Sequence, residues 1–362
     1  MNKLRKKLQK FSLIQRLASV KIAVVCLGLL FILVFWGTIA QVEHGLFFAQ
    51  KHFFHSWVFL AFGFLPFPGA QLVLWVLFIN LICAAIVHFS YLKSHLGILI
   101  IHFGLLFYFV AAFVTFHVTQ ESQLTLLEGE GSNVAVAYHD WEFSIWKADN
   151  ENKKNVIAFD TNTLKKGNHL SIPQLHLNFL VDAYYPNASA KTTLTQIPFD
   201  KDPEKNFPGI ALEVQTQEYH SIPLALYGGQ TTPAELKVQE DVYHLQLRRK
   251  RHLLPFTLTL KNFDMDEHPG TKIASRYQSL VAIENDGLSR EVLIYMNHPL
   301  RYKNYTFYQA SYSIDELGRK RSTLAVVRNS GRLLPYVASG IVFLGLLTHF
   351  LSMAIRKKIH AT

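Results

Sequence analysis

Histidine is the residue type in this sequence whose placement most clearly suggests chemistry. The chain has 17 histidines against four methionines, and His88, His95, His102, His117 and His349 fall within or at the ends of long apolar stretches. An ionisable side chain is costly to place in a bilayer and marks a functional site by default. Imidazole is also the usual protein ligand of haem iron in helical bundles. These histidines are therefore candidate axial ligands of haem.

His102 and His88 are the two candidates for haem binding. Both fall in the inner halves of consecutive predicted helices, so a short connection would bring them to similar depths. In His102-Phe103-Gly104 the glycine leaves room for a flat group or for another helix. The alternative is that each ring hydrogen-bonds a nearby backbone or hydroxyl group and holds helices together. That alternative is favoured for His88, His95, His117 and His349 and stays open for His102, with His88 as the reserve ligand.

Four long stretches without Asp, Glu, Lys or Arg must position these residues: 22–42, 52–92, 94–120 and 333–355. Each can supply the ~20 apolar residues that cross a hydrocarbon core ~30 Å thick. Pro66, Pro68 and Gly69 interrupt the second stretch, because proline breaks a helix. Transmembrane helices are therefore predicted at 22–41, 70–91, 96–117 and 333–355. The segment 41–69 is predicted to be a short loop in the membrane interface, anchored by Trp57.

Basic residues predict the orientation of these helices, since Lys and Arg near short loops stay on the cytoplasmic side. They concentrate in the N-terminal segment 1–21, at Lys93 and in the tail 356–362. A multi-pass protein of the cytoplasmic (inner) membrane is predicted, with both termini cytoplasmic and residues 119–332 on the periplasmic or extracytoplasmic side. A signal peptide is rejected because the first apolar run is nearly twice as long as a signal core. Membrane anchoring partly explains the net charge of +10, so no nucleic-acid partner is expected.

The region 119–332 is predicted to be a β-rich domain. Short alternating segments such as 243–247 (YHLQL), 256–260 (FTLTL) and 291–295 (EVLIY) are separated by turn residues. The fold class is therefore a membrane protein with four transmembrane α-helices and a large extracytoplasmic β-rich domain, a sandwich or a partly open barrel, inserted between helices three and four.

Other chemistries lack their residues. The sequence has no HExxH, GxSxG, P-loop or GxGxxG motif. Its two cysteines, Cys26 and Cys83, fall in predicted helices, which argues against thiol–disulfide exchange by this chain. His268 and His298 lie in predicted turns of the outer domain and, although they could be ligands there, are interpreted as exposed turn residues. No catalytic residue is predicted.

The distal part of the β-rich region carries a specific pattern. Its segments are 263–270 (FDMDEHPG), 275–279 (SRYQS), 296–300 (MNHPL) and 302–312 (YKNYTFYQASY). This pattern resembles the ResB (CcsB) family, a component of system II cytochrome c maturation. Residues 94–104 (SHLGILIIHFG) and 124–131 (LTLLEGEG) are similar to that family's third helix and its entry into the outer domain.

The resemblance implies a role beside a CcsA-type haem-handling membrane protein. Together they would carry haem b, bound non-covalently, across the membrane and attach it to the Cys-x-x-Cys-His motif of apocytochrome c through thioether bonds. It also implies that a transmembrane histidine binds the haem iron, with His102 as the candidate and His88 in reserve. The chain would be a non-catalytic or co-catalytic subunit of a holocytochrome c synthase (haem lyase). Thiol-reducing proteins of the same pathway are further expected partners.

Two alternatives stay open. A stand-alone b-type haem protein that transfers electrons would need two axial ligands, for which His88 and His102 are the pair. A non-haem scaffold would use its outer domain only to bind apocytochrome. The tryptophan-rich motif of the CcsA-type partner is not recognisable here, since the five tryptophans are scattered.

The outer domain is expected to receive the unfolded apocytochrome along an edge strand.

Overall fold

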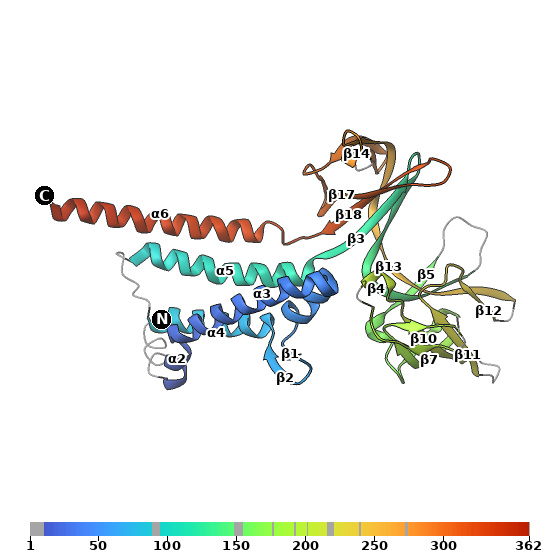
Figure 1. The fold of residues 1–362 in the computed structure, drawn as a ribbon, viewed down its shortest axis with the longest axis horizontal. Helices are drawn as coiled ribbons and strands as arrows, with labels where there is room; N and C mark the ends of the chain where they lie inside the picture. The colour runs from blue at the N-terminus through green and yellow to red at the C-terminus, as the bar shows by residue number, and fades with distance from the viewer. Residues whose placement is uncertain are drawn as a thin grey trace. The chain divides into compact units, whose positions relative to one another are not determined.

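The structure, a computed structural model, divides the chain into two compact units (Figure 1). It describes residues 11–88, 95–147, 155–175, 177–191, 193–200, 202–215, 221–238, 240–271 and 274–361. The helical unit comprises residues 1–119 and 329–362, and the β unit comprises residues 120–328. The β-rich region is thus inserted between the third and fourth long helices, which confirms the predicted fold class.

Four helices among the described residues are long and apolar enough to cross a membrane. The helices of this unit are α2 (Ser12–Leu17), α3 (Val20–Ala49), α4 (Ala70–Val87), α5 (Leu96–Val118) and α6 (Leu334–Ala361). α4 begins directly after Gly69, as the proline and glycine pattern predicted. Residues 89–91 of the predicted second helix, Lys93 and residues 1–10 of the N-terminal segment lie outside the described part. α6 continues past the predicted end at 355, through the basic tail.

The prediction of a short loop over 41–69 is wrong. α3 continues to Ala49 past a non-helical Gly45 (φ 80°), and a π-helical turn follows at Gln50–Phe54. A two-stranded hairpin of β1 (Val58–Ala61) and β2 (Leu65–Pro68) completes the segment. The cause is hydrophobic packing: the Trp36 ring of α3 lies 5.5–5.9 Å from four phenylalanine rings of this segment, Phe53, Phe59, Phe62 and Phe67. Packing of these rings, of which Phe53 and Phe59 are buried, holds the hairpin against α3.

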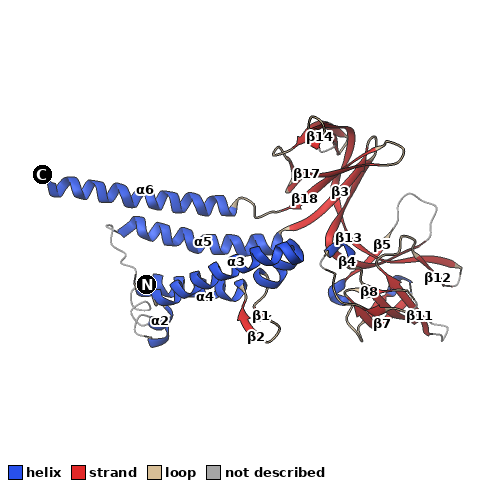
Figure 2. Ribbon diagram, in the orientation of Figure 1, coloured by secondary structure: helices blue, strands red, loops and turns tan. Residues whose placement is uncertain are grey.

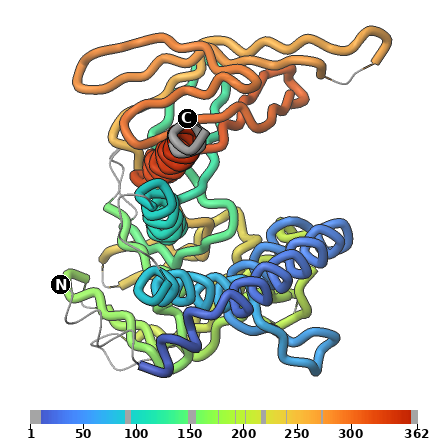
Figure 3. Tube along the Cα trace, turned by 90° about the vertical axis from the view of Figure 1, so that its left-hand side faces the viewer, coloured from blue at the N-terminus to red at the C-terminus, as the bar shows by residue number. Residues whose placement is uncertain are grey.

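Glycines let α5 and α6 approach closely, and the two helices lie side by side (Figure 3). A Cβ atom added to Gly97 would lie 2.5 Å from the His349 backbone nitrogen, and one added to Gly345 would lie 2.7 Å from the Ile101 nitrogen. The hydrophobic effect does not drive helices together in lipid. Close van der Waals packing at small residues stabilises such contacts instead. On the other side of the unit, buried Asn80 of α4 donates hydrogen bonds to the backbone carbonyls of Leu17 and Ser19.

The β unit contains a ten-stranded sheet and a four-stranded sheet, with one further pair of short strands (Figure 2). The strands are β3 (Gln120–Leu127), β4 (Gly131–Lys147), β5 (Val156–Asp160), β6 (His169–Ile172), β7 (Leu177–Tyr185), β8 (Ala188–Ser189), β9 (Thr195–Gln196), β10 (Gly209–Gln215), β11 (Ser221–Tyr227), β12 (Ala234–Val238), β13 (Asp241–Glu267), β14 (Ala274–Asn285), β15 (Leu288–Tyr295), β16 (Leu300–Tyr302), β17 (Tyr305–Ile314) and β18 (Lys320–Arg328). All named pairings are antiparallel.

Two separate hydrophobic cores stabilise the β unit. The first, around Phe263 and Phe307, draws on β3, β13 and β14 to β18, and β15 returns to contact β16 and β17. This part of the large sheet is therefore rolled, like a partly open barrel. The second, around Phe143 and Phe179, lies between the β4–β13 part of the large sheet and the four-stranded sheet β11-β10-β7-β6. That part is a sandwich, so the domain combines both predicted architectures.

The long strands β4 and β13 connect the two cores and carry a buried ion pair. Arg248 Nε lies 2.9 Å from Glu142 Oε1, with the two side chains only 11% and 6% exposed. The Arg248 guanidinium also lies 5.4 Å from the Trp146 ring. A buried charge is tolerated when its partner stays in place. This pair therefore constrains the register of β4 against β13.

We expect the substitution Gly104→Leu to separate α5 from α6. A Cβ atom at Gly104 would already lie 2.7 Å from Val342 Cγ2, and overpacking of this kind costs about 1–3 kcal/mol. Thermal unfolding of the purified full chain in detergent measures the loss. Gly340→Leu is the matched control, because a Cβ atom at Gly340 of α6 meets nothing within 4 Å. Equal losses in the two variants would contradict close packing at Gly104.

We expect Glu142→Ala to destabilise the β unit strongly, because it leaves Arg248 buried without its partner. Breaking one side of a buried ion pair costs about 3–5 kcal/mol. Asp266→Ala is the control: it removes the partner of Arg276 from a pair whose side chains are 59% and 61% exposed, and exposed pairs add little. Limited proteolysis of the full chain against temperature compares the two. A control as unstable as Glu142→Ala would refute the assignment.

Candidate functional site

His102 lies in the second turn of α5 and is held by its own helix. Its Nδ1 is 2.8 Å from the backbone carbonyl oxygen of Ile98. A carbonyl oxygen only accepts hydrogen bonds, so Nδ1 carries the proton and donates it. In the neutral ring Nε2 is then the nitrogen with the lone pair. A hydrogen bond from Nδ1 to a backbone carbonyl is the arrangement that orients a metal-binding histidine for coordination through Nε2.

Gly104 does not provide room for a flat group. The position that a Cβ atom would take lies 3.0 Å from the Val342 backbone nitrogen and 3.1 Å from Ile341 Cγ2 of α6. Of the two alternatives left open by the sequence, the structure shows another helix beside this glycine. The case for His102 therefore rests on its own ring and not on the neighbouring glycine.

His88 caps the C-terminal end of α4 and is exposed. Its Nε2 lies 3.1 Å from the Ala18 carbonyl oxygen, between α2 and α3. Nε2 must therefore be the donor, which leaves Nδ1 as the acceptor nitrogen. Nδ1 is adjacent to the ring carbon that bears the side chain and is the more hindered of the two nitrogens. His102 is therefore better prepared than His88 to bind a metal.

The register of α4 against α5 gives the depths of these two histidines. Ring contacts join Trp75 to Phe113 (5.6 Å) and Phe78 to Phe109 (5.5 Å), so the helices run antiparallel. Extending this register places His88 opposite residues 99–100, about 4 Å along the axis from His102 at 1.5 Å per residue. The similar depths agree with the expectation from the short connection. The hydrogen bonds nevertheless hold the two rings to different backbone segments.

The remaining candidate histidines have varied surroundings. His95 is exposed at the start of α5, and His349 of α6 is partly buried with its backbone against Gly97. In the β unit His268 is exposed, and His298 stacks on Tyr295 with ring centroids 4.1 Å apart. Cys26 and Cys83 are buried free cysteines of α3 and α4. Among the described residues, no group of three or more His, Cys, Asp or Glu side chains could hold a metal ion.

The sequence did not lead us to predict the packed histidine side chains of residues 41–69, the segment expected to be a loop. His44 and His52 are four residues either side of Phe48, whose ring lies 4.8 Å from His44 and stacks on His52 at 5.1 Å. His55 and His117 both contact Phe116. The spacing of four residues from His44 to Phe48 and to His52 was the available signal, because it predicts one helical face.

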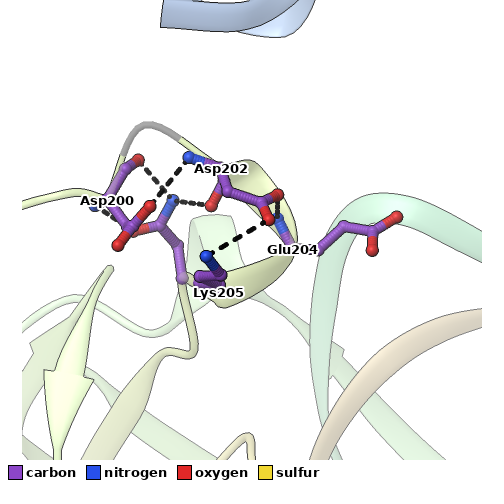
Figure 4. Close-up of polar contacts among 5 residues, drawn as sticks. Asp200, Asp202, Glu204 and Lys205 are labelled. Carbon is purple, nitrogen blue, oxygen red and sulfur yellow. Dashed lines mark hydrogen bonds and ion pairs between the residues drawn. The ribbon is translucent and has the colours of Figure 1, made fainter.

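The carboxylates of an acidic loop in the β unit accept hydrogen bonds from the backbone of the same loop. Asp202 accepts a hydrogen bond from the Glu204 amide at 3.0 Å, and its own amide donates to Asp200 Oδ1 at 2.9 Å (Figure 4). Lys205 Nζ lies 3.8 Å from Asp202 Oδ2. These contacts cap the short turn at Pro203–Lys205. The loop is therefore a structural turn.

The residues of the specific sequence pattern build the first core of the β unit. Phe263 and Phe307 are fully buried, and Leu300 and Tyr305 are less than 10% exposed. The Phe256 ring contacts the rings of Tyr302 and Tyr305 at 4.9 and 5.7 Å. The Tyr295–His298 pair closes the turn before β16. The pattern therefore specifies a rolled sheet.

Comparison with known proteins finds a family match in this part of the chain. Residues 224–331 match the ResB-like family. Protein NrfI of Wolinella succinogenes is 35% identical over 108 residues, which are 29% of this chain and 12% of that protein. The aligned part thus spans about one eighth of the curated relative. The family match covers β12 to β18 and excludes α2 to α5. The family that matches residues 224–331 is the one that the sequence pattern resembles.

Proposed function

We propose that this chain is a component of the system II cytochrome c maturation complex. It acts with a CcsA-type partner to carry haem b across the membrane for covalent attachment to apocytochrome c. The observation that carries the proposal is the ResB-like family match at residues 224–331. The four apolar helices supply a membrane frame that agrees with it. In this role the chain is a non-catalytic or co-catalytic subunit of the holocytochrome c synthase.

The haem, which is the cargo, fits the chemistry of His102. The ring donates from Nδ1 to Ile98, so Nε2 is the nitrogen suited to the iron. Beside it Phe103 is 61% exposed, an apolar surface that suits the flat face of a porphyrin. Haem binding at this position would shield the porphyrin from water and occupy one axial position of the iron. His88 stays the reserve ligand.

The β unit is the receiving surface for apocytochrome in this proposal. β11 is an edge strand of the four-stranded sheet, where it pairs with β10. An extended peptide can add to such an edge through main-chain hydrogen bonds. Pro223 within β11 removes one backbone donor and limits unspecific pairing along this edge. An unfolded apocytochrome segment is the kind of partner that fits an edge strand.

We expect His102→Ala to remove haem from the complex purified with its CcsA-type partner, and added imidazole to restore part of it. Alanine removes the Nε2 ligand but leaves open the space of the histidine ring, which free imidazole can fill. Haem per complex is measured by the pyridine haemochrome assay, and the Soret band reports ligation. His349→Ala is the control, since His349 is also partly buried in this unit. His88→Ala is expected to keep its haem.

Three outcomes would count against this assignment. Unchanged haem in His102→Ala would favour the non-haem scaffold. Loss of haem in His88→Ala alone would move the ligand to the reserve residue. A stable low-spin bis-histidine spectrum in the chain purified without its partner, lost in either single variant, would favour the stand-alone electron-transfer protein.

We expect a photo-crosslinking amino acid at Ile222 to capture apocytochrome. Ile222 lies on β11 and is 40% exposed. The same amino acid at Leu317, which is 79% exposed in the turn between β17 and β18, is the control. The readout is the crosslinked product in the complete complex with an apocytochrome added. Crosslinks of apocytochrome to the partner subunit alone, with none to this chain, would end this part of the proposal.

A further inference from the structure

The helical unit is rich in basic residues and almost free of acidic ones. Residues 1–119 and 329–362 contain thirteen Lys and Arg residues but one acidic residue, Glu43. Among the residues that the structure describes, neither Arg16 nor Lys21 forms an ion pair. The counter-ions of these side chains must therefore come from outside the unit. Anionic headgroups are the counter-ions that a membrane supplies to basic residues at its surface.

A groove between α3 and α4 begins at one of these basic residues. Its volume is about 340 Å³, and its lining is apolar apart from Lys21 at one end. From Lys21 it follows α3 to Leu29, where Pro68 lines the other end. Residues 21–29 span ~12 Å of helix at 1.5 Å per residue. The groove thus joins a cationic end to an apolar channel.

Packing and hydrogen bonding hold this groove in shape. Its floor includes Cys26 and Val73, which are 4% and 3% exposed and belong to one hydrophobic core. Asn80 of α4 donates a hydrogen bond to the Ser19 carbonyl oxygen at 2.9 Å, which fixes the start of α3 beside α4. The rim is open, since Val25 is 60% exposed. A ligand can therefore enter from the side without separating the helices.

The lining selects the class of ligand. The volume is near the lower limit of the ~300–1,000 Å³ of ligand pockets, which suits a single acyl chain. The ammonium group of Lys21 is a point charge that binds phosphate oxygens. Lys21 also lies in the first turn of α3, where the helix dipole favours an anion. An anion that carries a long apolar chain fits both ends of the groove.

We propose that the α3–α4 groove binds one anionic phospholipid, with its phosphate at Lys21 and one acyl chain along the groove. Arg16, exposed five residues before Lys21, adds positive charge at this end of α3. In the predicted orientation this end lies at the cytoplasmic leaflet, which is the anionic one. The inference is independent of the proposed function, because it involves neither haem nor apocytochrome. The competing account is a surface that contacts all lipids without preference.

The first test compares two phospholipids with the same acyl chains, phosphatidylglycerol and phosphatidylethanolamine, by native mass spectrometry of the full chain. We expect tighter binding of phosphatidylglycerol, and we expect Lys21→Gln to weaken it about fivefold, the scale for one basic residue near an anionic membrane surface. Lys51→Gln is the control, because Lys51 is also exposed but lies in the turn after the far end of α3. Equal affinities for the two lipids, or equal effects of the two variants, would overturn the proposal.

The second test fills the groove. We expect Val25→Trp to weaken phosphatidylglycerol binding by about tenfold, a typical effect of overpacking one site. Val24→Trp is the matched control, since Val24 is 62% exposed on the same helix and does not line the groove. Thermal unfolding checks that both variants are folded. The same affinity in both variants would rule out an acyl chain in this groove.

The third test identifies the occupant in intact cells. A photo-crosslinking amino acid at Val25 is expected to capture a phospholipid, which mass spectrometry of the purified chain detects as an adduct. The same amino acid at Val24 is expected to give no preference for anionic lipids. Capture of a protein segment at Val25, in place of a lipid, would show that another membrane helix covers the groove and would refute the lipid site.

Discussion

The helical unit depends on one constraint: within a bilayer every polar group must find its partner inside the protein. Asn80 donates to two carbonyls at the α2–α3 junction, His88 to Ala18, and His102 to the preceding turn of its own helix. Thr38 and Thr348 likewise donate to carbonyls four residues earlier. For a histidine this constraint has a chemical result, since the nitrogen that donates fixes which nitrogen can coordinate. The internal hydrogen bonds therefore determine which ring nitrogen of each imidazole is the acceptor.

The residues of the family pattern and the candidate haem ligands lie in different units of the chain. The pattern that resembles the matched family, including Phe263, Tyr305 and Phe307, is buried in the rolled sheet. These aromatic side chains specify an architecture. The candidate haem ligand His102 lies in α5 and the reserve ligand His88 at the end of α4, both outside the matched residues. The family match concerns residues 224–331, while hydrogen-bond geometry singles out His102 as the candidate ligand.

Much of the fold could be predicted from the sequence, because a charge-free run of about 20 residues has few alternatives to a membrane helix. The start of α4 after Gly69 and the β-rich insertion followed from equally local signals. The hairpin after α3 could not be predicted, since it depends on Trp36 contacting rings far along the chain. The packing of Gly104 against α6 joins residues more than 200 positions apart, and local patterns do not report such contacts.

Strand β13 contributes side chains to both cores of the β unit. Its inward-facing residues have odd numbers in one core and even numbers in the other. Tyr243, Leu245 and Leu247 enter the second core at odd positions, whereas Leu254, Phe256, Leu258 and Leu260 enter the first at even positions. Faces alternate along a strand, so this phase change moves the core to the other side. The pairing with β4 is irregular between Arg249 and Arg251 and between Leu253 and Leu258. Insertions or deletions between Leu247 and Leu254 leave the alternation of each core intact. Natural variation in the length of this strand is therefore expected to collect in residues 249–253.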